Sequence, residues 1–237
     1  MHQHNTPSRK EIWKMFDAIS PTYDRVNRLM TAGLDKKWRK AVASHLPAGE
    51  SLSLLDCATG TGDQLFSLLE RCPPIRKAVG VDLAESMLAI AREKTAKKVY
   101  RERVEWRVAS ITALPFPDES FECITISFGV RNVDNLALAL SECKRVLKPN
   151  GRLLILETSL PKNWLVKSLH LFYLRALLPK LGGWVSKNRN AYHYLNKTAE
   201  TFPSGEQFCT ILQQAGFSHV DVYPLTFGAV SIYRADK

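Results

Sequence analysis

The stretch that decides the fold is LLDCATGTGD, residues 54–63, where apolar residues pass into an acid, small residues and a Gly-Thr-Gly turn. Its first part is short and apolar, as in a buried strand, and QLFSLLERC at 64–72 has the apolar spacing of a helix. A strand that turns on glycines into a helix opens many ligand-binding α/β units. The turn therefore raises the main question of function, which is what kind of ligand it holds.

The same alternation continues along the chain. We expect strands at 52–57, 77–83, 104–110, 121–129 and 151–159, and helices at 64–72, 85–98, 135–147 and 204–216. The last two apolar runs, FSHVDVYPL and TFGAVSIYRA, are joined too tightly for a parallel crossover, so they should pair antiparallel at the sheet edge. The pattern predicts one α/β domain over 1–237, with a Rossmann-like, seven-stranded, mostly parallel sheet and an antiparallel edge strand.

Two helical additions flank this core. Residues 9–45 form a leader or lid, which we expect Ser20-Pro21 to interrupt and Gly33 to break again. Residues 160–203 form a basic amphipathic helical insertion. Its basic character is unusually uniform, because Thr158 to Ala199 contain no Asp or Glu and seven cations: Lys162, Lys167, Arg175, Lys180, Lys187, Arg189 and Lys197.

Composition limits the class of protein. The 237 residues are 45% apolar and 24% charged, which are globular values, and the net charge is +10. We find no signal peptide and no uncharged apolar stretch of 18 residues, so we expect a cytoplasmic protein without a membrane-spanning helix. The cysteines form no CxxC and should be reduced thiols, with no metal site: Cys57, Cys72, Cys123, Cys143 and Cys209.

The ligand of the turn can be narrowed by what the turn lacks. It has no lysine of a phosphate loop, and GxGxxG is incomplete because Leu65 stands three residues after Gly62. Asp82 ends the second expected strand, where an acid can bind ribose hydroxyls. Asp56 and Asp63 would repel a pyrophosphate but suit a ligand with an ammonium and a sulfonium. S-adenosylmethionine fits this description, and a merely tight strand-to-helix turn is the alternative.

The motifs also belong to a longer pattern. LLDCATGTGD, VGVDLAESM, LPFPDESFECITISFGVRNV and RVLKPNGRLLILE have the order and spacing of class I S-adenosylmethionine-dependent methyltransferases. More narrowly, the leader MFDAISPTYDRVNRLMTAGLDKKW, the segment ITISFGVRN and the tail YHYLNKTAETFPSGEQF resemble the ubiquinone/menaquinone biosynthesis C-methyltransferases of the UbiE/MenG, or demethylmenaquinone methyltransferase, type. The resemblance covers nearly the whole chain.

The resemblance implies where the cofactor lies. Asp82 should meet its ribose, Ser110 and Ile111 its adenine, and Ser127 its methionine part; the full set is Gly60, Thr61, Gly62, Asp63, Asp82, Ser110, Ile111 and Ser127. The chain departs from the family at Thr59, where Gly is more usual, at Ser110 for Asn, at Asp35 for His and at Val26. These departures affect details of substrate and adenine contact rather than the reaction class.

The implied reaction methylates a ring carbon of a prenylated quinol in menaquinone or ubiquinone biosynthesis, with demethylmenaquinol to menaquinol as its best instance. The carbon becomes nucleophilic when a neighbouring hydroxyl loses its proton, so phenolate charge must be stabilised. We expect Arg131 to stabilise it or to hold a water that takes the proton, Asn132 to orient Arg131, and Tyr23 to bond the hydroxyl. His170 and His193 are possible bases. The alternatives are a salt bridge for Arg131, simple packing for Tyr23, and surface positions for the two histidines.

The insertion has a separate interpretation. As a helix, WLVKSLHLFYLRALLPKL places Lys167, Ser168, His170 and Arg175 within an arc of roughly 160 degrees. Such a helix can lie in a membrane surface, which predicts peripheral contact at the cytoplasmic face. A lid or a dimer contact is the alternative, and a homodimer stays open.

Other functions remain as alternatives. A methyltransferase of this type could act on another lipid or small molecule, such as a sterol, a phospholipid amine or a tocopherol. The charge of +10 permits RNA binding, but the sequence has no interleaved basic–aromatic motif for stacking bases, so we expect no nucleic-acid partner. A protein that senses the cofactor without catalysis is the third hypothesis.

Overall fold

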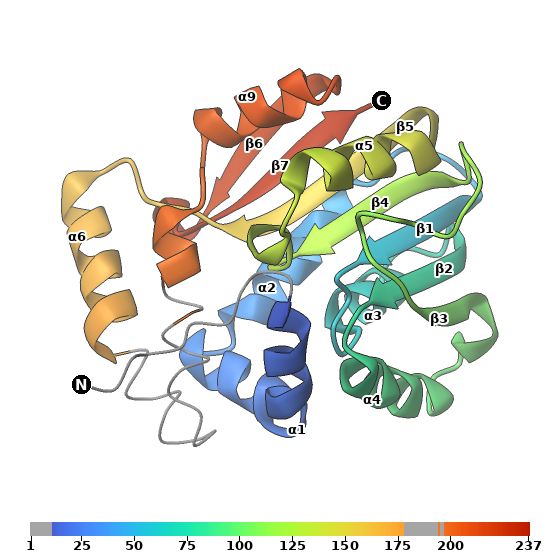
Figure 1. Ribbon diagram of the computed structural model, residues 1–237, viewed down its shortest axis with the longest axis horizontal. Helices are drawn as coiled ribbons and strands as arrows, with labels where there is room; N and C mark the ends of the chain where they lie inside the picture. The colour runs from blue at the N-terminus through green and yellow to red at the C-terminus, as the bar shows by residue number, and fades with distance from the viewer. Residues whose placement is uncertain (1–10, 178–193, 195–196) are drawn as a thin grey trace.

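One twisted sheet organises the molecule. The computed structural model describes residues 11–177, 194 and 197–237. Within them, seven strands lie in the order β3-β2-β1-β4-β5-β7-β6 (Figure 1). Their bounds are β1 Leu52–Cys57, β2 Ile75–Asp82, β3 Val104–Val108, β4 Phe121–Ser127, β5 Leu147–Thr158, β6 Ser218–Leu225 and β7 Val230–Asp236. Strands β1 to β5 pair in parallel, while β7 runs antiparallel to both β5 and β6. The expected sheet is confirmed, with the antiparallel strand one place inside the edge.

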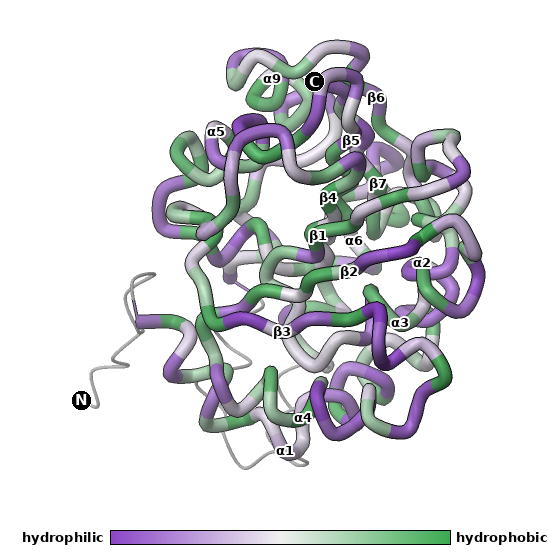
Figure 2. Tube along the Cα trace, turned by 90° about the vertical axis from the view of Figure 1, so that its right-hand side faces the viewer, coloured by the Kyte–Doolittle hydropathy of each residue, from purple (hydrophilic) through white to green (hydrophobic). Residues whose placement is uncertain are grey.

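Helices cover both faces of this sheet. Their bounds are α1 Ile12–Met30, α2 Leu34–Val42, α3 Asp63–Leu69, α4 Glu85–Ala96, α5 Leu136–Val146, α6 Trp164–Phe172 and α9 Glu206–Gln214. Strand side chains alternate between the faces, so Leu55 packs with residues of α5 and α9, and Leu54 packs with residues of α2 and α3. The central strands β1 and β4 are therefore mostly buried, whereas apolar and hydrophilic residues alternate along the edge strand β3 (Figure 2).

The leader differs from the expectation at its proline. Helix α1 continues through Pro21, so the predicted interruption at Ser20-Pro21 is wrong. A proline inside a helix frees the carbonyl four residues earlier, which here belongs to Asp17. The Ser86 hydroxyl of α4 donates to that carbonyl at 3.2 Å, and therefore replaces part of what the proline removes. The predicted break at Gly33 is confirmed, since Gly33 has φ +77 between α1 and α2.

The insertion also differs in its orientation. After α6 the helix widens into the π turn η5 (Tyr173–Leu177), and residues 178–193, including His193, lie outside the described part. The face of α6 that we expected to be basic is not uniformly so. His170 points inward and is half-buried, while Arg175 forms an ion pair with Glu200. Four large apolar side chains of α6 are instead exposed: Trp164, Leu165, Leu169 and Phe172.

All five cysteines carry free thiols, and Cys57 and Cys123 are buried in core strands as their apolar surroundings predict. Within the described residues, no helix combines the length and the apolar character that crossing a bilayer requires.

Candidate active site

A cavity of about 450 Å³ opens where the parallel strands end. Its walls come from the segments that follow β1, β2, β3 and β4, because the carboxyl ends of these strands meet at one edge of the sheet. Helix α1 closes the remaining side with Ile12, Trp13, Phe16 and Tyr23. The leader is therefore part of the site, and a ligand in this cavity lies between it and the sheet edge.

The glycine turn meets the cavity at Gly60, whose φ of +56 leaves open space where a side chain would project. Asp82 supports this residue from the end of β2: its Oδ2 accepts the Gly60 N–H at 2.8 Å, and its Oδ1 accepts the Ala84 N–H at 2.9 Å. Burial raises the pKa of Asp82 above its ordinary value. Each carboxyl oxygen keeps a second lone pair, so Asp82 can also accept hydrogen bonds from ribose hydroxyls.

The other expected cofactor residues of this edge line the same cavity. Ser110 and Ile111 follow β3, and Ser127 ends β4, with its hydroxyl donating to Gln64 Oε1 at 3.0 Å. Among the described lining residues the charged side chains are acidic, Asp82 and Asp134. The described part of the cavity thus combines apolar walls with a carboxylate near an exposed glycine backbone, and none of its described lining residues is a cation. This combination fits S-adenosylmethionine and disfavours a phosphate-bearing ligand.

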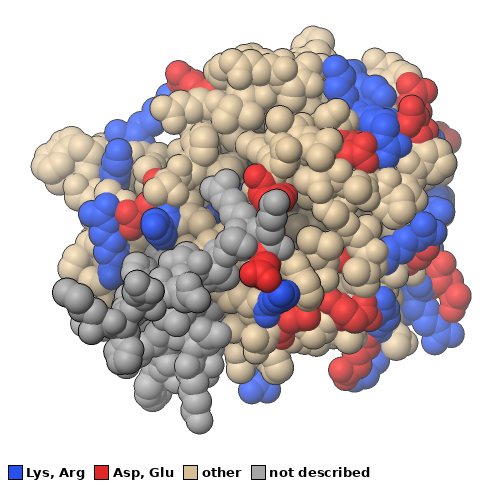
Figure 3. Space-filling view, viewed as in Figure 1, with Lys and Arg blue, Asp and Glu red and all other residues tan. Residues whose placement is uncertain are grey.

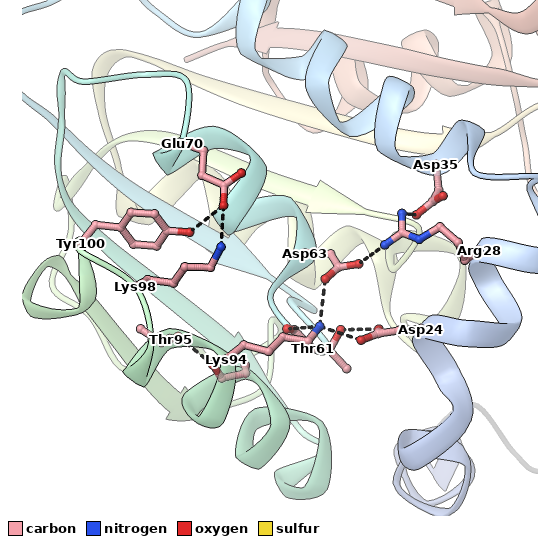
Figure 4. Close-up of polar contacts among 11 residues, drawn as sticks. Asp24, Arg28, Asp35, Thr61, Asp63, Glu70, Lys94, Thr95, Lys98 and Tyr100 are labelled. Atoms are coloured by element: carbon pink, nitrogen blue, oxygen red, sulfur yellow. Dashed lines mark hydrogen bonds and ion pairs between the residues drawn. The ribbon is translucent and has the colours of Figure 1, made fainter.

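Three residues of the turn lie elsewhere. Thr61, Gly62 and Asp63 do not line the cavity in the described structure. The Thr61 hydroxyl donates to Asp24 at 2.6 Å, and Asp63 forms ion pairs with Lys94 and with Arg28 (Figure 4). Because the Thr61 and Asp63 side chains are engaged in these contacts, the structure gives no support to a direct cofactor contact through either of them.

Gly62 and its neighbours act on the site indirectly. A Cβ at Gly62 would lie 2.7 Å from the Trp106 ring, so glycine allows the turn to pack against β3. Lys94 of α4 reaches Asp24 at 2.6 Å and Asp63 at 2.9 Å, which ties α1, the turn and α4 together (Figure 4). These ion pairs hold the leader against the turn, and they thereby position α1, whose Tyr23 lines the cavity.

A second, smaller cavity of about 140 Å³ adjoins the first. The two cavities share Tyr23 and Phe128 as lining residues. Phe128 has φ +58, a left-handed conformation that is rare for a bulky residue and recurs at functional sites. Arg131, His170 and Thr158 also line the smaller cavity, which therefore extends from the end of β4 to the insertion.

Arg131 is held by a buried ion pair. Its Nη1 contacts Glu157 Oε1 at 2.5 Å and donates to the Phe128 carbonyl at 3.0 Å. The Arg131 side chain is 9% exposed and that of Glu157 is 0% exposed. The alternative that Arg131 forms a salt bridge is confirmed. Its Nε has no partner among the described residues, so a donor is left over beside the smaller cavity.

Asn132 and Tyr23 complete the expected set. Asn132 lines the larger cavity, and its buried Oδ1 has no partner among the described residues. Burial raises the pKa of Tyr23, so its phenol stays protonated and can donate a hydrogen bond. Tyr23 thus lines both cavities, Asn132 lines the larger one and Arg131 the smaller one.

Sequence reasoning missed Glu157, Gln64 and Asp24. Glu157 could have been noticed, because a carboxylate at the end of the apolar run LLILE must be paired if the strand is buried. Asp56 was assigned only to the turn, and it accepts from the hydroxyls of Thr59 at 2.5 Å and Thr125 at 2.6 Å. Asp24 and Gln64 carry no local signal, because their partners are distant in the chain.

The fold is that of the class I S-adenosylmethionine-dependent methyltransferases, and the larger cavity fits their cofactor. The solved structure of an S-adenosylmethionine-dependent methyltransferase from Thermotoga maritima, described as a possible histamine N-methyltransferase, superposes with a TM-score of 0.67 at 23% identity over 95% of this chain and 99% of its own. The [4+2]-cyclase SpnF also shares the fold, with a TM-score of 0.64 at 14% identity, 98% of this chain and 97% of its own. Such distant likeness shows the fold alone.

Sequence comparison identifies the family. Residues 4–237 match the model of the ubiE/COQ5 methyltransferase family, and the chain belongs to that family. It is 40% identical to the ubiquinone/menaquinone biosynthesis C-methyltransferase UbiE of Geobacter sulfurreducens, over 98% of this chain and 90% of that protein. It is also 40% identical to the demethylmenaquinone methyltransferase of Chlorobaculum parvum, over 98% of this chain and 95% of that protein.

Proposed function

We propose that this protein transfers a methyl group to a ring carbon of a prenylated quinol, with demethylmenaquinol as the substrate and menaquinol as the product. The family and the names of its relatives support this choice. The observation that carries it is the pair of adjoining cavities. The larger fits the cofactor, and the smaller adjoins it through Tyr23 and Phe128.

The polar atoms of the residues that line the two cavities suit an aromatic diol. Arg131 Nε and Asn132 Oδ1 are buried without partners among the described residues, and buried polar atoms are normally paired. A quinol hydroxyl can donate to Asn132, and Arg131 can donate to the oxygen as it becomes a phenolate. Tyr23, whose phenol stays protonated, can bond the same oxygen. S-adenosylmethionine supplies an electrophilic methyl group when bound, and these residues align the ring with it.

Peripheral membrane contact is the second part of the proposal. On α6, Trp164, Leu165, Leu169 and Phe172 are between 59% and 71% exposed. Lys and Arg side chains lie beside uncharged residues at the end of the molecule where α6 is found (Figures 1 and 3). This surface can enter the interface of a bilayer, where a prenylated quinol resides. The opposite side of α6 lines the smaller cavity through His170, so one helix would connect lipid with the site.

The test supplies labelled S-adenosylmethionine with demethylmenaquinol, with a benzoquinol that lacks the corresponding methyl group, and with a sterol, a phospholipid amine and an RNA. Methyl transfer to the naphthoquinol, absent with its oxidised quinone, is expected. Transfer to the benzoquinol alone would correct the ring type. Cofactor binding with transfer to neither quinol would refute the proposed substrate and leave the other acceptors to decide.

A further inference from the structure

His170 is placed unlike an ordinary histidine of a basic surface helix. It lies on the inner side of α6 and lines the smaller cavity together with Tyr23 and Arg131. Its Nε2 is buried and has no hydrogen-bond partner among the described residues. His170 therefore does not take the surface position that was the alternative to a role as a base. A buried, unpaired imidazole nitrogen beside a cavity needs an explanation, because leaving it unsatisfied costs stability.

We propose that His170 is the catalytic base that accepts the proton of the quinol hydroxyl, through Nε2, when the ring binds in the smaller cavity. This inference rests on the proposed function, and it names a group that the reaction needs and Arg131 cannot supply. An arginine stays protonated at all accessible pH values, so it can stabilise the phenolate but cannot take the proton.

The other ionisable groups around His170 are engaged or unsuited. Those facing the cavity or acting on the imidazole are Tyr23, Asp35, Arg39, Arg131, Tyr173 and Glu200. Asp35 is paired with Arg28 at 2.6 Å, and Glu200 is paired with Arg175 at 2.8 Å. The hydroxyl of Tyr173 donates to the Met30 carbonyl. Among the described residues that line this cavity, His170 is the base whose acceptor atom is left free.

The protonation state of His170 suits this role. Burial lowers its pKa below the ordinary 6.5, and the carboxylate of Glu200 opposes this with a smaller effect. The imidazole is therefore neutral at pH 7 and can accept a proton. A base that is neutral near the working pH and buried beside the substrate can act in general base catalysis.

Nε2 takes the hydroxyl proton, and the resulting phenolate directs an electron pair from its ring carbon to the methyl group. The carbon–methyl bond forms as the sulfur–methyl bond breaks, and the sulfur keeps that bond's electron pair. The ring carbon then loses its hydrogen as a proton to water, and Nε2 returns its proton to the oxygen. In sum, the quinol ring gains one methyl group and one proton is released to water.

The experiment compares wild type, His170→Gln and a matched control, His45→Gln, in detergent with a short-chain demethylmenaquinol. His45 also has a pKa lowered by burial, but it lines neither cavity. We expect wild-type kcat to reach a plateau above an inflection that lies below pH 6.5. His170→Gln should lose at least about thirtyfold in kcat at pH 7, its rate rising with pH without that inflection, while KM changes little. His45→Gln should behave as wild type, and added imidazole should partly restore activity to His170→Ala.

A second readout needs no turnover. In the cofactor-free protein, NMR of labelled histidines should show one imidazole, missing from His170→Gln, that titrates below pH 6.5 and shifts when 4-methoxy-1-naphthol is added. An unshifted His170 signal, or a His170→Gln variant with the wild-type rate and pH profile, would overturn the inference. If wild type methylates no quinol, the proposed function fails, and the NMR result still decides whether His170 contacts a naphthol.

Discussion

The double role of Arg131 can be separated by changing the ion pair in two steps. Arg131→Met alone leaves Glu157 buried and without its cation, although Glu157 Oε1 still accepts the Thr158 N–H at 2.7 Å. Arg131→Met with Glu157→Gln removes both charges and keeps an oxygen for that N–H. The first change disrupts the fold and the site together, and the second should repair only the fold.

The structure sets the size of both effects. Removing one partner of a buried ion pair costs about 3–5 kcal/mol, and the exposures of 9% and 0% put this pair in the buried class. For a chain of this length, 1 kcal/mol moves Tm by about 2–4 °C, so Arg131→Met should lose roughly 6–20 °C. Replacing both charges is often nearly neutral, so the double variant should return to within about 1–2 kcal/mol of wild type.

The assays are thermal unfolding and methyl transfer to demethylmenaquinol on the same samples. If Arg131 stabilises the phenolate, the double variant is stable but stays at least about tenfold slower than wild type, which corresponds to about 1.4 kcal/mol of barrier. If the double variant recovers activity along with stability, Arg131 only holds the loop, and the catalytic role assigned to it is refuted. Glu157→Gln alone measures what the carboxylate contributes.

Three further predictions concern other parts of the molecule. In Gly129→Ala the new Cβ would lie 2.6 Å from the Cβ of Ala58, and both residues line the larger cavity. We therefore expect a loss of about 1–3 kcal/mol of stability and weaker S-adenosylmethionine binding by calorimetry. Gly49→Ala, whose new Cβ meets only a leucine methyl at 3.3 Å, is the control. Burial raises the pKa of Asp56 from 3.8 to about 6, so its protonated form is favoured in the folded state. The stability that this group contributes is present below pH 3.8 and is lost as pH rises to about 6, a fall of about 3 kcal/mol. In urea unfolding between pH 4 and 7, Asp56→Asn should show no such fall in the free energy of unfolding. The same pH dependence of stability in wild type and Asp56→Asn would contradict the raised pKa of Asp56. Leu169→Glu should abolish flotation with anionic liposomes while leaving activity in detergent unchanged; unchanged flotation would exclude α6 from lipid contact.

The sequence by itself determined the α/β sheet and most of the cofactor edge. Alternating strand and helix patterns are local, and in parallel sheets strand ends converge, so Gly60, Asp82, Ser110 and Ser127 could be placed together from their positions after strands. The resemblance added the family, which the match over residues 4–237 shows.

The tertiary structure decided what depends on partners far apart in the chain. Pro21 stays inside α1 because Ser86, 65 residues later, meets the freed carbonyl. Thr61 and Asp63 turn away from the cavity because Asp24 and Lys94 hold them. His170 faces the smaller cavity because α6 turns this side toward the protein and leaves its other side exposed. Periodicity says which residues share a helix face, but only packing says which face is turned toward the protein, since that choice depends on the free energy of contacts with distant segments.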